Sequence, residues 1–166
     1  NTYTFPIGCP QIIFHKRTPL FIPELNTTQN RLTISGQVNF SSHLKADDDV
    51  EMIVVVFYPH TMNMFLNTPT SIFYNKEVSG YDIEDKHLNE LAMQVFDCAD
   101  NNRCVTLIEE WLLSQLSTKP TDTAYRVNRM SAAIGKLLAA PHTLVTELSA
   151  TCCLSKKQFE REFYLH

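Results

Sequence analysis

The sequence lacks the excess of positive charge that nucleic-acid-binding proteins commonly carry. Its 14 Lys and Arg residues are outnumbered by 18 Asp and Glu residues, which gives a formal net charge of −4. Phosphate-binding surfaces are normally positive. The net charge therefore gives no support for DNA binding by the chain as a whole, so any such site must be local.

Long apolar runs and paired cysteines are also missing. No apolar stretch approaches the roughly 20 residues that a membrane span needs, and the first ten residues lack the layout of a secretion signal. The five cysteines are odd in number and form no C-x-x-C pair. Thiols in a reducing cytoplasm explain them better than a disulfide framework. We therefore expect a cytoplasmic protein without a membrane segment.

Short motifs typical of enzymes and metal sites are missing too. There is no P-loop, no nucleophile elbow and no H-E-x-x-H motif. The run Asp47–Asp49 lacks the ligand spacing and the glycine of a calcium loop. Cys9 and His15 lie on adjacent strand-like segments without a third ligand, so a structural thiol explains Cys9 better than chemistry does. The sequence predicts no enzyme, no cofactor and no metal.

The sequence does contain enough apolar and aromatic residues for a folded core. It has 166 residues, 44% of them hydrophobic, with ten Phe and six Tyr. This composition excludes wholesale disorder, and the length suits one domain, or one domain with a small second unit.

Strand-like patterns fill the first sixty residues. Residues 31–40 (RLTISGQVNF) alternate between apolar and polar side chains, which predicts a half-buried strand. Residues 51–58 (EMIVVVFY) are apolar and β-branched, which predicts a strand buried on both faces. Residues 11–15 (QIIFH) and 19–23 (PLFIP) are shorter candidates, and the prolines of the second favour an edge.

Helical periodicity replaces this pattern after Pro59. A short helix is expected over residues 60–67, and longer amphipathic helices over 86–96, 101–116 and 125–139. The expected N-cap of the helix over 101–116 is Asp100. The expected inward face of this helix consists of Val105, Ile108, Trp111, Leu112 and Leu116.

The polar stretch 117–124 contains a proline and shows no periodicity, so it is the predicted linker. It would separate an α+β effector or dimerisation domain, residues 1–116, from a helical unit, residues 125–166. Sheet comes first and helices follow, which predicts the α+β fold class.

The last twenty-five residues predict two short helices joined by a tight turn. The first covers residues 143–152 with Thr143 as its N-cap, and the second begins with a capping box formed by Ser155 and Gln158. Such a pair describes a helix-turn-helix, although capped helical hairpins also occur in many helical domains. The inward residues are Phe159 and Phe163, and the outward residues are Lys156, Lys157, Glu160, Arg161 and Tyr164.

This C-terminal stretch resembles the first helix-turn-helix of AraC-type bacterial transcription regulators. The family pattern is a branched apolar residue, E-L-A, a turn with Leu-Ser, and then x-x-Q-Leu-x-R-x-Phe. The matching residues are Val145, Glu147, Leu148, Leu154, Ser155, Gln158, Phe159, Arg161 and Phe163. The stretches FPIGCPQIIFH and VVVFYPHTMNMFLNTP also resemble the sensor-like N-terminal domain found in a subset of these regulators.

The resemblance implies a regulator that binds double-stranded DNA. Lys157, Glu160 and Arg161 would face base edges, and Lys156 would lie near phosphate. The N-terminal sheet would be antiparallel and partly rolled, as in cupin-like sensors. A homodimer, a small-molecule effector and RNA polymerase are the further partners that the family implies.

One residue and the chain length depart from the family pattern. Cys153 stands where the family usually has glycine, and a left-handed backbone there would cost about 1 kcal/mol. The family also carries a second helix-turn-helix, whereas the sequence stops where the first recognition helix should end. We therefore expect the chain to be an incomplete part of such a regulator.

The alternative is a cupin-like small-molecule-binding protein or metal-dependent enzyme whose C-terminal helices are merely structural. It would need a pocket with convergent polar or metal-ligating groups. The candidate residues for a ligand pocket in either case are His15, Tyr58 and His60. A pure protein-interaction module is a third interpretation.

Overall fold

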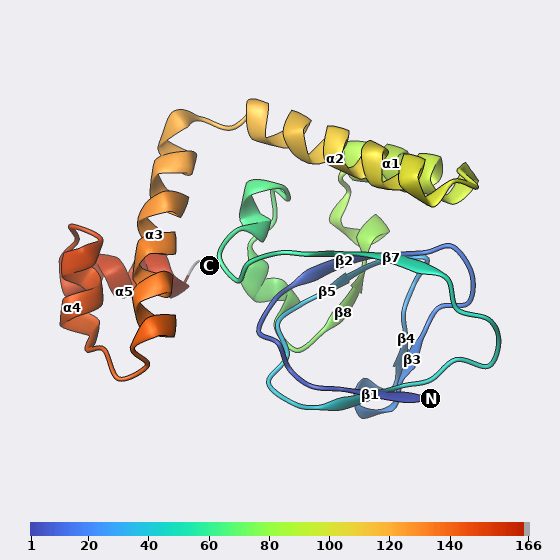
Figure 1. Ribbon diagram of the computed structural model, residues 1–166, viewed down its shortest axis with the longest axis horizontal. Coiled ribbons are helices and arrows are strands. Elements are labelled where there is room, and N and C mark those ends of the chain that lie inside the picture. The colour runs from blue at the N-terminus through green and yellow to red at the C-terminus, as the bar shows by residue number, and fades with distance from the viewer. Residues whose placement is uncertain (165–166) are drawn as a thin grey trace.

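The computed structural model describes residues 1–164, in which strands come first and helices follow (Figure 1). The strands are β1 (Thr2–Thr4), β2 (Gln11–His15), β3 (Phe21–Ile22), β4 (Thr27–Thr28), β5 (Leu32–Ser35), β6 (Ser42–Leu44), β7 (Met52–Val56) and β8 (Glu77–Ser79). The α-helices are α1 (Lys86–Asp97), α2 (Asn101–Ser117), α3 (Thr121–Ala139), α4 (Val145–Thr151) and α5 (Lys156–Tyr164). Short 3-10 turns are η1 (Pro23–Leu25), η2 (Met62–Met64), η3 (Thr70–Phe73) and η4 (Gly80–Ile83). This order confirms the predicted α+β class.

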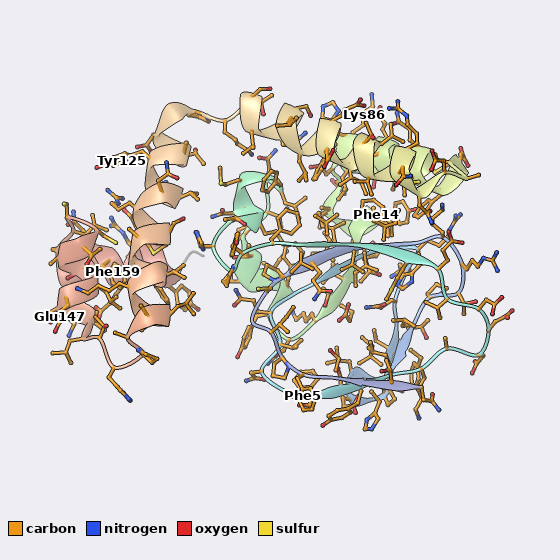
Figure 2. The ribbon with its side chains drawn as sticks, viewed as in Figure 1. Phe5, Phe14, Lys86, Tyr125, Glu147 and Phe159 are labelled. Carbon is orange, nitrogen blue, oxygen red and sulfur yellow. The ribbon has the colours of Figure 1, made fainter. Side chains whose placement is uncertain are left out.

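The largest sheet is antiparallel, with strand order β7-β2-β5-β8. Successive side chains of a strand point to opposite faces. Ile12 and Phe14 of β2 are buried on the face covered by α1 and α2, where Phe14 contacts the ring of Phe96 (Figure 2). Gln11, Ile13 and His15 therefore point to the other face of the sheet.

The predicted strand over residues 51–58 is present as β7, but the prediction that both of its faces are buried is wrong. Within the described residues β7 pairs only with β2 and forms an edge of the sheet. Val56 is 54% exposed there. An apolar, β-branched run fits an edge strand as well as a central one. The neighbour that completes the other side of the sheet, β8, comes from later in the chain.

The predicted strand over residues 31–40 is shorter than its alternation indicates. Strand β5 ends at Ser35 because Gly36 packs directly against the backbone of η3. A Cβ atom on Gly36 would lie 1.8 Å from the carbonyl oxygen of Phe73. Beyond this contact, Val38 and Phe40 leave the sheet and line an interior cavity instead.

Two short ribbons close the remaining side of the strand-rich region. Strands β1 and β6 form one ribbon, and β3 and β4 form the other. A bridge between Phe21 and Lys45 connects the two ribbons. Together with the large sheet they form a partly rolled arrangement of strands (Figure 1). Residues of the large sheet and of both ribbons line a cavity. We call residues 1–117, with α1 and α2, the sheet unit.

Helices α1 and α2 pack side by side on the large sheet (Figure 1). Asp100 caps α2 as predicted, because its carboxylate accepts from the backbone N–H of Asn102. The predicted inward face of α2 is partly wrong. Val105 is 47% exposed, and Cys104 takes its place in the core with Ile108 and Trp111. A cysteine thiol packs like a small apolar side chain, which shifts the buried stripe by one position.

The predicted linker is largely helical. Helix α2 extends to Ser117 and α3 begins at Thr121, which leaves three residues between them. Pro120 stops neither helix because it lies immediately before the first turn of α3. The helix predicted over residues 60–67 is reduced to the 3-10 turn η2.

Helices α3, α4 and α5 form a second, smaller core beside the sheet unit (Figure 1). Its buried residues are Met130, Ala133, Leu148, Cys152 and Phe159. We call residues 121–164 the helical head. The two cores are separate clusters, since no buried residue belongs to both within the described part of the chain.

Candidate functional site

The turn between α4 and α5 has a left-handed residue at its centre. Cys153 has φ +53°. The AraC-type regulators that this stretch resembles usually have glycine at this position. The N–H of Cys153 donates to the carbonyl of Ala150 at 3.0 Å, and the N–H of Leu154 donates to that of Ser149 at 2.9 Å. These bonds satisfy carbonyls at the end of α4 and fix the direction in which the chain enters α5.

The capping box at the start of α5 is confirmed. The Ser155 hydroxyl accepts from the N–H of Gln158 at 3.3 Å, and the Gln158 Oε1 atom accepts from the N–H of Ser155 at 3.1 Å. The predicted N-cap of α4 is wrong. The Thr143 hydroxyl donates to the carbonyl of Ala140 at 2.6 Å, and Leu144 occupies the cap position without a side-chain bond.

One aromatic side chain and one ion pair fix α5 against the rest of the head. Phe159 is 3% exposed and packs among the core residues of α3 and α4. Arg129 on α3 donates to the carboxylate of Glu162 at 2.6 Å, and these side chains are 17% and 13% exposed. Phe163 was predicted to lie on the inward face of α5, packed on the preceding helix. This is wrong, because Phe163 is 42% exposed, although its ring contacts that of Phe159.

The opposite side of α5 is open to solvent. The predicted DNA-contacting residues Lys156, Lys157, Glu160 and Arg161 are all exposed. Lys156 and Glu160 lie 3.9 Å apart as an exposed i,i+4 ion pair. Because Glu162 is paired with Arg129 on the inner side, this outer face carries three cationic side chains and one anionic side chain. The local charge is therefore positive, although that of the chain is negative.

The structure does not bring the three predicted pocket residues together. His15 and Tyr58 lie at opposite ends of the β2–β7 ladder, in which His15 pairs with Met52 and Gln11 with Val56. Tyr58 is 74% exposed, with its ring centroid 6.4 Å from that of His60.

His60 is 5% exposed and reaches out of the sheet unit. Its Nε2 atom lies 2.6 Å from the Ser131 hydroxyl on α3. That hydroxyl donates to the carbonyl of Val127 at 2.9 Å, so His60 Nε2–H is the donor to Ser131. This residue therefore joins the sheet unit to the helical head and borders the cleft of about 470 Å³ between them.

His15 belongs to a buried polar network behind the interior cavity of the sheet unit. Gln29 donates from Nε2 to Glu77 at 2.9 Å, and Ser35 donates from its hydroxyl to the same carboxylate at 2.8 Å. Since the Gln29 Nε2 atom is a donor, its Oε1 atom accepts from His15 Nε2–H at 2.8 Å. Burial lowers the pKa of His15 and raises the pKa of Glu77.

The cavity beside this network has a volume of about 120 Å³. Most of its wall is apolar, with Ile13, Ile22 and Val54 among the lining residues, and Gln29, Ser35 and Glu77 supply polar groups. Sequence reasoning missed Gln29 and Glu77. Gln29 lies in an irregular connection and Glu77 in a three-residue strand, so neither belongs to a pattern long enough to predict burial.

Two kinds of feature are absent from residues 1–164, a cluster of metal ligands and a membrane-spanning helix. No three His, Cys, Asp or Glu side chains in this part of the chain come together in a way that could hold a metal ion. None of its helices has the length and apolar character needed to cross a membrane.

The comparisons with known proteins concern the N-terminal half. Residues 1–79 match the model of a family described as a domain of unknown function, DUF6597. This match contains every strand that the structure describes and ends with the last residue of β8. The comparisons with curated proteins and with solved structures found no match.

Proposed function

We propose that this chain is a DNA-binding transcription regulator of the AraC type, with α5 as its DNA-reading helix. The observation that supports this most is the two-sided build of α5. Phe159 and Glu162 hold one side to the head, while Lys156, Lys157 and Arg161 are exposed on the other. A recognition helix needs both a fixed back and a polar front.

The exposed residues suit separate tasks on a duplex. Arg161 has the planar guanidinium that pairs bidentately with the O6 and N7 atoms of guanine. Glu160 can accept from cytosine N4, and Lys157 lies beside it in the first turns of the helix. Lys156 is the first residue of α5. Its ammonium group and the free backbone N–H groups at the start of the helix can both bind a DNA phosphate.

The sheet unit is the regulatory part of this proposal. An effector that binds one arrangement of the chain more tightly would shift the population toward it. The contact from His60 to Ser131 is a direct route from the sheet unit to α3. A homodimer of sheet units would set the spacing of two heads on DNA, and RNA polymerase is the partner that a bound regulator would influence.

The test is DNA binding by the full-length gene product, with DNA from its own upstream region and random DNA of equal length. Arg161→Ala is expected to weaken binding to the upstream DNA by about 1–3 kcal/mol and to leave random DNA nearly unaffected. Lys156→Ala is expected to weaken both and to reduce the salt slope by about 0.9. Arg103→Ala, an exposed arginine on α2, is the matched control and is expected to change neither.

Equal loss on both DNAs for Arg161→Ala would remove its base-reading role. Binding of neither DNA above the level of an unrelated acidic protein would refute the proposal. The second candidate function, a small-molecule-binding protein with structural helices, would then be favoured by the interior cavity with its polar wall.

A further inference from the structure

The interior cavity contains an acidic group without a cation. Glu77 lies on β8, and its two carboxylate oxygens each accept one hydrogen bond, from Gln29 and from Ser35. No Lys, Arg or His side chain forms an ion pair with it among residues 1–164. A carboxylate has about four acceptor positions, so two neutral donors leave part of its capacity unused.

The position of the Glu77 carboxylate is fixed by buried side chains that lie next to it. Gln29 is 5% exposed, and its amide cannot turn away because His15 donates to its Oε1 atom. His15 is fully buried, and its other ring nitrogen, Nδ1, has no hydrogen-bond partner in the described part of the chain. The network therefore presents Glu77 to the cavity in one orientation, as a preorganised acceptor.

Leaving a carboxylate in this place is unfavourable without a partner. Burial is the largest cause of the raised pKa of Glu77. Buried charges in proteins are normally paired, and an unpaired one favours its neutral form. A bound cation that donates hydrogen bonds would remove this penalty.

The walls of the cavity limit what such a cation can be. A volume of about 120 Å³ corresponds to about four water molecules, so a ligand of about four or five non-hydrogen atoms fits. Ile13, Ile22 and Val54 would contact an aliphatic body rather than a polar one. A metal ion needs several charged or carbonyl ligands, whereas Glu77 is the one carboxylate among the described lining residues.

We propose that the cavity of the sheet unit binds a compact aliphatic amine, with its ammonium group on Glu77 and its alkyl body against the apolar wall. An alkylammonium group is charged at neutral pH, as the Lys side chain is. It forms charge-assisted hydrogen bonds that a neutral alcohol cannot match. That the bound amine acts as an effector depends on the proposed regulatory function, whereas the binding of an amine to the cavity does not.

The experiment measures binding of isobutylammonium, isobutanol and isobutyrate to the chain by titration calorimetry at neutral pH. The amine is expected to bind at least about tenfold more tightly than the alcohol, and the acid not at all. Glu77→Gln is expected to reduce amine affinity to that of the alcohol, which it leaves unchanged. Glu109→Gln, an exposed position on α2, is the charge-matched control and keeps the wild-type preference.

A second variant tests the same cavity independently, in case Glu77→Gln does not fold. Val54→Phe fills the cavity but keeps Glu77, so it is expected to abolish both amine and alcohol binding with an unchanged circular dichroism spectrum. The proposal is overturned if amine and alcohol bind equally to the wild type, or if Glu77→Gln retains the preference. DNA is absent from these titrations, so their outcome is independent of the DNA-binding test. Loss of DNA binding in that test would leave the amine site standing.

Discussion

Replacing Phe159 by alanine should strongly destabilise the helical head while leaving the sheet unit unaffected. Phe159 is 3% exposed and is the largest side chain of the small core formed by α3, α4 and α5. The core of the sheet unit contains none of these residues. Among residues 1–164, His60 bonds to Ser131 across the two units, and Lys119 in the short connection bonds to Asn67. Because the two cores share no buried side chain among the described residues, we expect them to unfold separately.

The magnitude follows from burial and from the size of the core. Truncating a buried Phe to Ala costs about 3–5 kcal/mol, and less where the site can collapse around the gap. The head core has five buried residues, so we expect a cost near the lower limit, about 3 kcal/mol. A unit this small is rarely more stable than about 3–5 kcal/mol. The variant head should therefore keep at most about 2 kcal/mol of its stability. With a slope of about 1 kcal/mol/M, its urea midpoint should fall by about 3 M.

The assay uses the one tryptophan as a reporter of the sheet unit. Trp111 lies on α2 and is 7% exposed in that core, so its fluorescence follows the sheet unit, whereas far-UV circular dichroism follows both units. Phe159→Ala should move the head's phase of the circular dichroism transition to low urea and leave the fluorescence transition unchanged. Phe163→Ala, one turn later and 42% exposed, is the control and should cost less than about 1.5 kcal/mol. Equal effects of the two variants, or a matching shift in fluorescence, would refute the reasoning.

Three further predictions concern single contacts. Glu162→Gln leaves the Arg129 guanidinium without its ionic partner and should cost the head about 2 kcal/mol in urea unfolding. This cost is smaller than for a fully buried pair because both side chains are partly exposed. Adding Arg129→Met should restore part of the lost stability. Burial raises the pKa of Glu77 above its usual 4.5, so ionised Glu77 lowers stability. Glu77→Gln should therefore raise the melting temperature by an amount that is zero below pH 4.5, grows above it and levels off past the folded-state pKa, in melts from about pH 4 to about pH 8. Cys153→Gly relieves a φ of +53° and should stabilise the head by about 0.5–1 kcal/mol, whereas Ala150→Gly in the exposed part of α4 should destabilise it by about 1 kcal/mol.

The helices were predictable because their determinants are local. Asp100 precedes an amphipathic run and caps it, and Ser155 and Gln158 form a capping box from their spacing alone. At Cys153 the resemblance to a family with glycine left open whether the backbone is left-handed, and the structure has φ +53° there. In each case the residues that decide the structure lie within about one helical turn of one another.

The strands were harder to predict because their neighbours come from distant parts of the chain. Residues 52–56 have the pattern of a buried strand, but among the described residues β7 pairs with β2 alone and is therefore an edge. Gly36 ends β5 because of a backbone contact with Phe73, thirty-seven positions away, which no local pattern reveals.

The difference between local and distant determinants also explains which site residues could be predicted from the sequence. Lys156, Lys157, Glu160 and Arg161 share one face of one helix, so their exposure follows from helical spacing. The polar network of the cavity joins four separate segments of the chain, and of its members the sequence singled out His15 alone.

Helix α3 contacts both the sheet unit and α5. Ser131 on one side receives the hydrogen bond from His60, and Arg129 on another side holds Glu162 of α5. These two positions are two residues apart, so a displacement of α3 by the sheet unit reaches the back of α5 through a single turn of helix. Because Glu162 and Phe159 fix α5 on that side, its exposed face moves with α3. The face of α5 that we propose to read DNA is thus connected to the sheet unit through α3 and the His60–Ser131 hydrogen bond, and regulation by an effector would need a connection of this kind.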